Sequence, residues 1–205
     1  MMRRFSVHPI FLLLLIVIAM SGEIALYSII FMSLLLHEAG HIVVARLVGV
    51  EVERCVLLPY GGEITLKNEH LLSSHQLRWI ALGGPIATVV GIGSGYLLPS
   101  TIGEPFIHVQ YLLLAVNMLP IWPLDGGKIL CHSLLTLYPR TKIYETFLSL
   151  SLCFITIIVL GTLLMLPGSI SLVVISLFLW IKVIGEWRVR KYRSAFEKVV
   201  MNRLT

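Results

Sequence analysis

Two histidines and a glutamate near the centre of an apolar segment have the spacing of a hydrolytic metal site. His37 and His41 are four residues apart in the pentapeptide HEAGH, so on a helix they share one face, about 6 Å apart along the axis. Both imidazoles can therefore bind one metal ion, and Glu38 lies on the same turn, within reach of a water that the metal activates. This H-E-x-x-H pattern predicts two zinc ligands, His37 and His41, and a general base, Glu38.

A catalytic zinc needs a third protein ligand and one open position. Asp125 is the best candidate, because the segment before it contains two prolines and two glycines follow it, which interrupts a helix at membrane depth. Glu145 and Glu186 are weaker candidates, since they flank solvated loops. Asn117, at the start of the interrupted segment, can donate a hydrogen bond to a developing oxyanion or to the substrate backbone, or else bond a neighbouring helix.

The composition predicts an all-α polytopic membrane protein. Of the 205 residues, 57% are hydrophobic and 13% are charged, whereas soluble domains contain about 25% charged residues. The three cysteines show no paired spacing and are interpreted as free thiols. We expect a six-helix core over residues 1–187 and a basic tail over 188–205. The expected transmembrane helices cover about 9–20, 24–48, 77–98, 106–119, 147–166 and 170–184.

The segment between the second and third expected spans has the pattern of β-structure. Residues 50–66 alternate between apolar and polar types around turn residues at 57–62, which predicts a small β-hairpin or re-entrant loop near the active site. The hairpin is either an ordinary connection or an edge that pairs with an extended substrate. Elsewhere, Gly83-Gly84-Pro85 is expected to interrupt the third span, residues 99–105 to form a loop, and residues 129–137 to form a short interfacial helix.

The distribution of basic residues predicts the orientation in the membrane. The three turns expected on the outer side, residues 21–23, 99–105 and 167–169, contain no lysine or arginine. By the positive-inside rule, both termini are expected in the cytoplasm, with the active site toward the cytoplasmic side. The net charge is +5, and the basic tail is interpreted as an anchor at the inner lipid leaflet rather than as a nucleic-acid-binding patch.

The motifs resemble one family of membrane enzymes. HEAGH at 37–41 on an apolar helix, followed by N-x-x-P at 117–120 and LDGG at 124–127, resembles the site-2 protease family of intramembrane zinc metalloproteases. The sequence LLPYGG at 57–62 and the segment 117–128 are similar to the sporulation branch of that family.

The resemblance implies one zinc ion held by His37, His41 and Asp125, with Glu38 as the catalytic base. It also implies that the enzyme removes the pro-sequence of a membrane-associated sporulation sigma factor, in the membrane that surrounds the forespore. Its partners would then be that substrate, membrane inhibitor proteins and the lipid bilayer. No motif indicates an oligomeric state.

Other functions are compatible with some of the same residues. A site-2-type protease could instead cleave an anti-sigma factor or a signal-peptide remnant. A metal-ion transporter or a metal-stabilised membrane scaffold belongs to a different class of protein. A transporter is expected to carry further intramembrane ligands or inverted repeats, which the sequence does not show, and a scaffold has no use for Glu38. The sequence therefore favours a zinc-dependent intramembrane endopeptidase.

Overall fold

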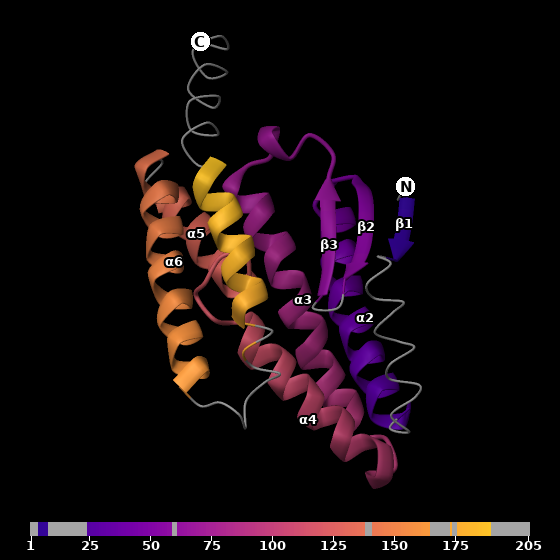
Figure 1. Ribbon diagram of the computed structural model, residues 1–205. Coiled ribbons are helices and arrows are strands. Elements are labelled where there is room, and N and C mark those ends of the chain that lie inside the picture. The colour runs from indigo at the N-terminus through magenta and orange to yellow at the C-terminus, as the bar shows by residue number, and fades with distance from the viewer. Residues whose placement is uncertain are drawn as a thin grey trace. The chain divides into compact units, whose positions relative to one another are not determined.

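The computed structural model describes residues 4–7, 24–58, 61–137, 141–164, 173 and 176–189. These residues are mostly helical, with one small sheet, and the chain divides into two compact units, Met1–Leu119 and Pro120–Thr205 (Figure 1). The expected span at residues 9–20 and nearly all of the expected tail lie outside the described residues.

In the first unit, the described residues form three α-helices: α2 (Ile24–Leu47), α3 (Ser74–Gly95) and α4 (Ser100–Asn117). α2 ends at Leu47, and two residues further Gly49 has a φ of 76°, in the left-handed region that glycine adopts without strain. α3 starts with a capping box, in which Ser73 Oγ accepts from the Gln76 N–H and the Gln76 side chain accepts from the Ser73 N–H. The ends of these helices are thus specified locally.

Two predictions for this unit are wrong. Gly83-Gly84-Pro85 does not interrupt the third helix, because α3 runs through all three residues. The glycines serve instead to bring α3 against α2: a Cβ at Gly83 would lie 2.6 Å from the Gly40 carbonyl oxygen. The loop expected at 99–105 is also wrong, because α4 begins at Ser100. Proline removes only one helical hydrogen bond, and α4 continues through Pro105.

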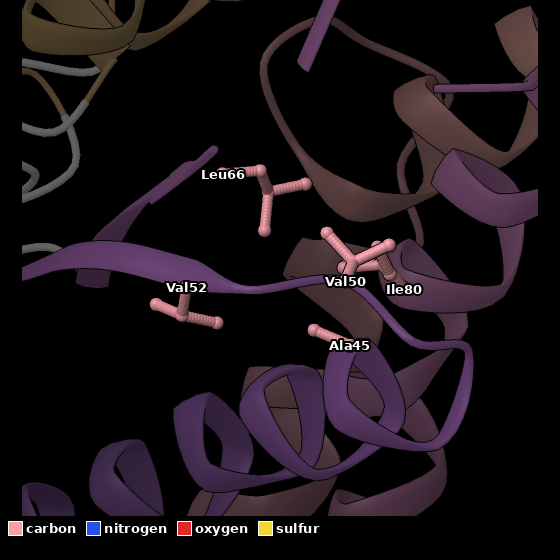
Figure 2. Packing of buried hydrophobic residues seen from close by; sticks show 5 residues of the cluster. All are labelled: Ala45, Val50, Val52, Leu66 and Ile80. Atoms are coloured by element: carbon pink, nitrogen blue, oxygen red, sulfur yellow. The ribbon is translucent and has the colours of Figure 1, made fainter. Parts of the chain in front are cut away.

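The expected β-hairpin is confirmed. Strand β2 (Val52–Leu58) pairs antiparallel with β3 (Gly61–Leu66), and β1 (Arg4–Val7) adds to β2 in parallel, so the strand order is β1-β2-β3. Both strands of the hairpin extend into the segment expected to form the turn. Figure 2 shows the apolar cluster between the sheet, α2 and α3, made by Ala45, Val50, Val52, Leu66 and Ile80.

An irregularity in β2 decides which side chains face α2. The pairing of Val52 with Leu66 is followed by that of Arg54 with Thr65, so β2 contains one extra residue at this point. In a regular strand, residues three apart face opposite sides. The extra residue lets both Val52 and Cys55 be buried, with exposed fractions of 3% and 1%.

The second unit contains α5 (Asp125–Leu137), α6 (Thr141–Leu164) and a helical stretch at residues 176–189 (Figure 1). The predicted break in the chain is found, because α4 ends at Asn117 and the next helix starts at Asp125, earlier than the expected 129. Two buried clusters hold the unit together. They consist of Trp122, Cys131, Phe147 and Leu148, and of Ile121, Ile155 and Val183.

The helices define a membrane protein. Among the described residues, three helical segments are long and apolar enough to cross a bilayer: Ile24–Leu47, Ser74–Gly95 and Ile143–Leu164. These segments overlap the expected spans at 24–48, 77–98 and 147–166. The count of six spans and the orientation stay predictions.

Candidate metal centre

The two histidines lie on the buried face of α2, where it packs against α3. The buried residues Ser33, His37 and His41 repeat every four positions along α2, as the helical period requires for one face. The imidazole rings are edge to face, with centroids 4.9 Å apart. The predicted placement of both imidazoles on one helix face is therefore confirmed.

A backbone carbonyl of α3 orients His41. Nδ1 of His41 lies 2.7 Å from the Ile80 carbonyl oxygen, which can only accept, so Nδ1 carries the proton of a neutral ring. The Gly84 N–H also lies 3.2 Å from Nδ1, but a protonated nitrogen cannot accept it, and the shorter contact with the carbonyl decides the tautomer. A bare Nε2 is the form of histidine that binds a metal.

His37 also contacts α3 through its Nδ1 atom, which lies 2.8 Å from Thr88 Oγ1. The Nε2 atoms of both histidines converge beside Gly84. A Cβ built at Gly84 would come 2.5 Å from Nε2 of His37 and closer still to Nε2 of His41. Because zinc binds histidine nitrogen at about 2.0–2.1 Å, an ion held by both Nε2 atoms would need the space that this glycine leaves. The histidine pair therefore fits a zinc ion.

Glu38 follows His37 on α2, and its charge acts on Cys55 of β2. Glu38 is buried, with an exposed fraction of 7%. Burial raises the pKa of the Cys55 thiol, and the negative charge of Glu38 raises this pKa further. Cys55 therefore remains a neutral thiol at physiological pH, which makes it a poor metal ligand. The hairpin was predicted near the active site, but no sequence pattern indicated that Cys55 would be the side chain on which the charge of Glu38 acts.

The second unit contains the predicted third ligand. Asp125 is the first residue of α5 and is buried, with an exposed fraction of 5%. A carboxylate at a helix N-terminus is favoured by the helix dipole. Gly127 lets residues 121–122 fold closely over this first turn, because a Cβ there would lie 2.7 Å from the Trp122 nitrogen. His37 and His41 of the first unit and Asp125 of the second are each buried and carry an atom of a type that binds zinc.

The other predicted site residues have different surroundings. Asn117 is the last residue of α4, half-buried, and its Nδ2 donates to the Leu113 carbonyl of the same helix at 3.0 Å. Its predicted contact with substrate or oxyanion stays a prediction. Glu145 and Glu186, the weaker candidates for the third ligand, are half-buried in the second unit.

Sequence reasoning missed the part that α3 plays in this site. Ile80, Gly84 and Thr88 repeat every four residues and contact the two imidazoles from one face of α3. Ile80 contributes only its backbone carbonyl, which no sequence motif can signal. Thr88 is a mildly polar residue in an apolar helix, where it can bond its own backbone, so its presence alone does not indicate a site.

Comparison with known proteins agrees with this geometry. Residues 25–102 match Peptidase family M50. Stage IV sporulation protein FB of Bacillus subtilis is 27% identical over 195 residues, which cover 92% of this chain and 68% of that protein. A zinc metalloprotease of Methanocaldococcus jannaschii is 30% identical over 211 residues, which cover 95% of this chain and 60% of that protein. The chain thus spans about two thirds of the length of these relatives.

A solved structure has the same fold. The site-2 protease from Methanocaldococcus jannaschii matches with a TM-score of 0.65 and 26% sequence identity, over 89% of this chain and 90% of that one. The family match, the zinc-metalloprotease relative and the buried histidine pair support a zinc-dependent protease. The chain is similar to the site-2 proteases, and its match to Peptidase family M50 covers residues 25–102.

Proposed function

We propose that this protein is an intramembrane endopeptidase, in which His37, His41 and Asp125 bind one zinc ion and Glu38 is the general base. The observation that carries the proposal is the convergence of the two histidine Nε2 atoms beside Gly84, on helices long and apolar enough to span a bilayer. Ionisable groups at that depth cost several kcal/mol and are retained for function. Two histidines alone make an incomplete catalytic site, and Asp125 supplies the third ligand.

Different residues of the chain have different roles in hydrolysis. When bound, zinc would act as a Lewis acid and lower the pKa of a water ligand to about 7. Glu38 takes a proton from the attacking water and later delivers it to the nitrogen of the leaving amine. The water oxygen adds to the peptide carbonyl, and the C–N bond breaks, so the products are a carboxylate and an amine. Asn117 is available to bind the oxyanion or the substrate backbone.

The substrate is a membrane-associated protein. Peptide bonds in a transmembrane helix have their carbonyls bonded internally, so the segment must unwind before it can be cleaved. Strand β3 is at one edge of the described sheet and could receive such an extended segment by strand addition. The charge of Glu38 raises the pKa of Cys55 in β2, so the sheet lies near the predicted base. This proximity supports binding of the substrate by strand addition.

The pro-sequence of a sporulation sigma factor is the preferred substrate. The similarity to stage IV sporulation protein FB over 92% of this chain supports this choice, together with the matching motifs at 57–62 and 117–128. The absence of basic residues from the three expected outer turns supports a site that opens toward the cytoplasm, where a sigma factor is found. Membrane inhibitor proteins of the same system are the proposed partners. An anti-sigma factor or a signal-peptide remnant is the alternative substrate.

Co-expression with tagged substrates tests the proposal. The full chain is produced together with a membrane-associated pro-sigma factor, an anti-sigma factor or a signal-peptide remnant, and the tagged products are sized and sequenced. We expect shortening of the pro-sigma factor, and none with a Glu38→Gln variant. Cleavage of only one of the other two would replace the substrate and keep the enzyme class. A zinc-loaded protein that cleaves none of them would contradict the proposed activity.

A further inference from the structure

The two histidines are oriented by groups of different chemistry. The Ile80 carbonyl can only accept a hydrogen bond, so it fixes the tautomer of His41 by itself. The Thr88 hydroxyl can either donate or accept, so its contact with His37 fixes nothing until the direction of the hydroxyl proton is known. That direction follows from the other contact of Thr88.

The hydroxyl of Thr88 has an acceptor within its own helix. Oγ1 of Thr88 lies 3.1 Å from the Gly84 carbonyl oxygen, which accepts the hydroxyl proton. The lone pairs of Oγ1 are then left for Nδ1 of His37, at 2.8 Å. Both hydrogen bonds therefore have the same direction: His37 Nδ1 donates to Thr88 Oγ1, and Thr88 Oγ1 donates to the Gly84 carbonyl. With Nδ1 protonated, Nε2 is the nitrogen through which a neutral His37 binds a metal.

Burial makes this arrangement specific. Thr88 has an exposed fraction of 0% and His37 of 2%, so bulk water cannot replace either contact. Without the hydroxyl, a buried imidazole would leave its Nδ1–H without an acceptor, which costs about 1–3 kcal/mol. The ring would then be free to move its proton to Nε2, the atom that must stay bare to bind a metal. The side chain of Thr88 thus sets the tautomer of His37, while the backbone carbonyl of Ile80 sets the tautomer of His41.

We propose that Thr88 is a positioning residue that sets the tautomer and ring orientation of His37, and thereby the zinc affinity of the site. The proposal rests on His37 being a zinc ligand, and it is independent of which substrate is cleaved. Partners of this kind in metalloproteins change metal affinity by about 10–100-fold when they are removed. The hydroxyl is the functional part of Thr88, so serine should replace it and valine, which has the same shape, should not.

The first test measures zinc affinity without any substrate. The purified full chain and three variants are titrated with zinc against a competing chelator. We expect Thr88→Val to bind zinc about 10–100-fold more weakly than the parent, and Thr88→Ser to bind close to the parent. The matched control is Val90→Thr, which exchanges the same two side chains in the opposite direction at an exposed position of α3, and its affinity should not change. Unchanged affinity in Thr88→Val would overturn the proposal.

The second test observes the tautomer directly and needs no variant at position 88. Histidine labelled with ¹⁵N gives distinct chemical shifts for protonated and bare ring nitrogens, and a His37→Gln variant identifies the signals of His37. In the zinc-free parent, we expect Nδ1 of His37 to carry the proton. A proton on Nε2 would overturn the proposal even if Thr88→Val did not fold. A parent that binds zinc and shows this tautomer but cleaves no peptide would refute the proposed function alone.

Discussion

A Cβ atom at Gly84 would lie 2.5 Å from Nε2 of His37. The residue that lets α3 approach α2 is thus also the residue that leaves room for a ligand between the imidazoles. The lack of a side chain at Gly84 therefore serves the site as well as the helix packing, because a Cβ atom there would crowd both ring nitrogens.

Gly84→Ala is expected to abolish zinc binding while the helix still forms. Alanine is favoured over glycine in a helix by about 1 kcal/mol, so α3 itself gains stability, but the new methyl group lies between the Nε2 atoms. Zinc content of the purified protein, measured by mass spectrometry of the metal, checks this. Gly93→Ala is the matched control on the same helix, since a Cβ there meets nothing within 4 Å. Zinc at the level of the parent in Gly84→Ala would refute the assigned position.

The histidine pair could be predicted from the sequence because its geometry is local. Four residues of helix bring His37 and His41 to one face whatever the rest of the chain does. The hairpin was equally accessible, since alternation of apolar and polar residues is a local pattern. The extra residue that turns Cys55 toward the buried side of β2 has no such pattern, because it depends on the register with β3.

The role of α3 could not be predicted for a different physical reason. Glycine and proline break helices in water, and they also allow two helices to approach closely, so Gly83-Gly84-Pro85 is compatible with either outcome. Whether the segment breaks the helix or allows close packing depends on the helix that packs against it, and the sequence does not identify that helix. The acceptors on Ile80 and Thr88 are likewise visible only when α2 and α3 are placed together.

Asp125→Ala is expected to reduce zinc content strongly. With the carboxylate removed, only the two imidazoles would remain, and a site with two protein ligands holds zinc weakly. Metal analysis of the purified variant is the measurement. Glu145→Ala and Glu186→Ala remove carboxylates that do not belong to the ligand set, and both should retain zinc. If zinc is retained in Asp125→Ala and lost in one of these controls, the carboxylate removed in that control is the third ligand.

Glu38→Gln is expected to separate metal binding from catalysis. Glutamine keeps the size of the side chain but cannot accept the proton of the attacking water, so the rate of cleavage should fall by about 10²–10⁴-fold. Zinc content should stay at the level of the parent, because the histidines and Asp125 are unchanged. The rate is measured by the time course of substrate shortening. Cleavage at the rate of the parent would show that another group acts as the base.

Gln110→Met is expected to stabilise the first unit. Gln110 has an exposed fraction of 0%, and neither its Oε1 nor its Nε2 has a hydrogen-bond partner among the described residues. A buried polar atom without a partner costs about 1–3 kcal/mol, and methionine removes both atoms while keeping an unbranched shape beside Gly91. The free energy of unfolding should therefore rise by a few kcal/mol at most, as measured by denaturant titration in detergent.

A second glutamine provides the opposite case. The Gln76 side chain accepts from the Ser73 N–H in the capping box of α3, so Gln76→Met should lower the free energy of unfolding by about 1 kcal/mol. Opposite signs for the two substitutions would show that the amide at 110 is paired poorly and the one at 76 well. Loss of stability in Gln110→Met would mean that this amide has a partner, and an ordered water between α2, α3 and α4 would then be the candidate.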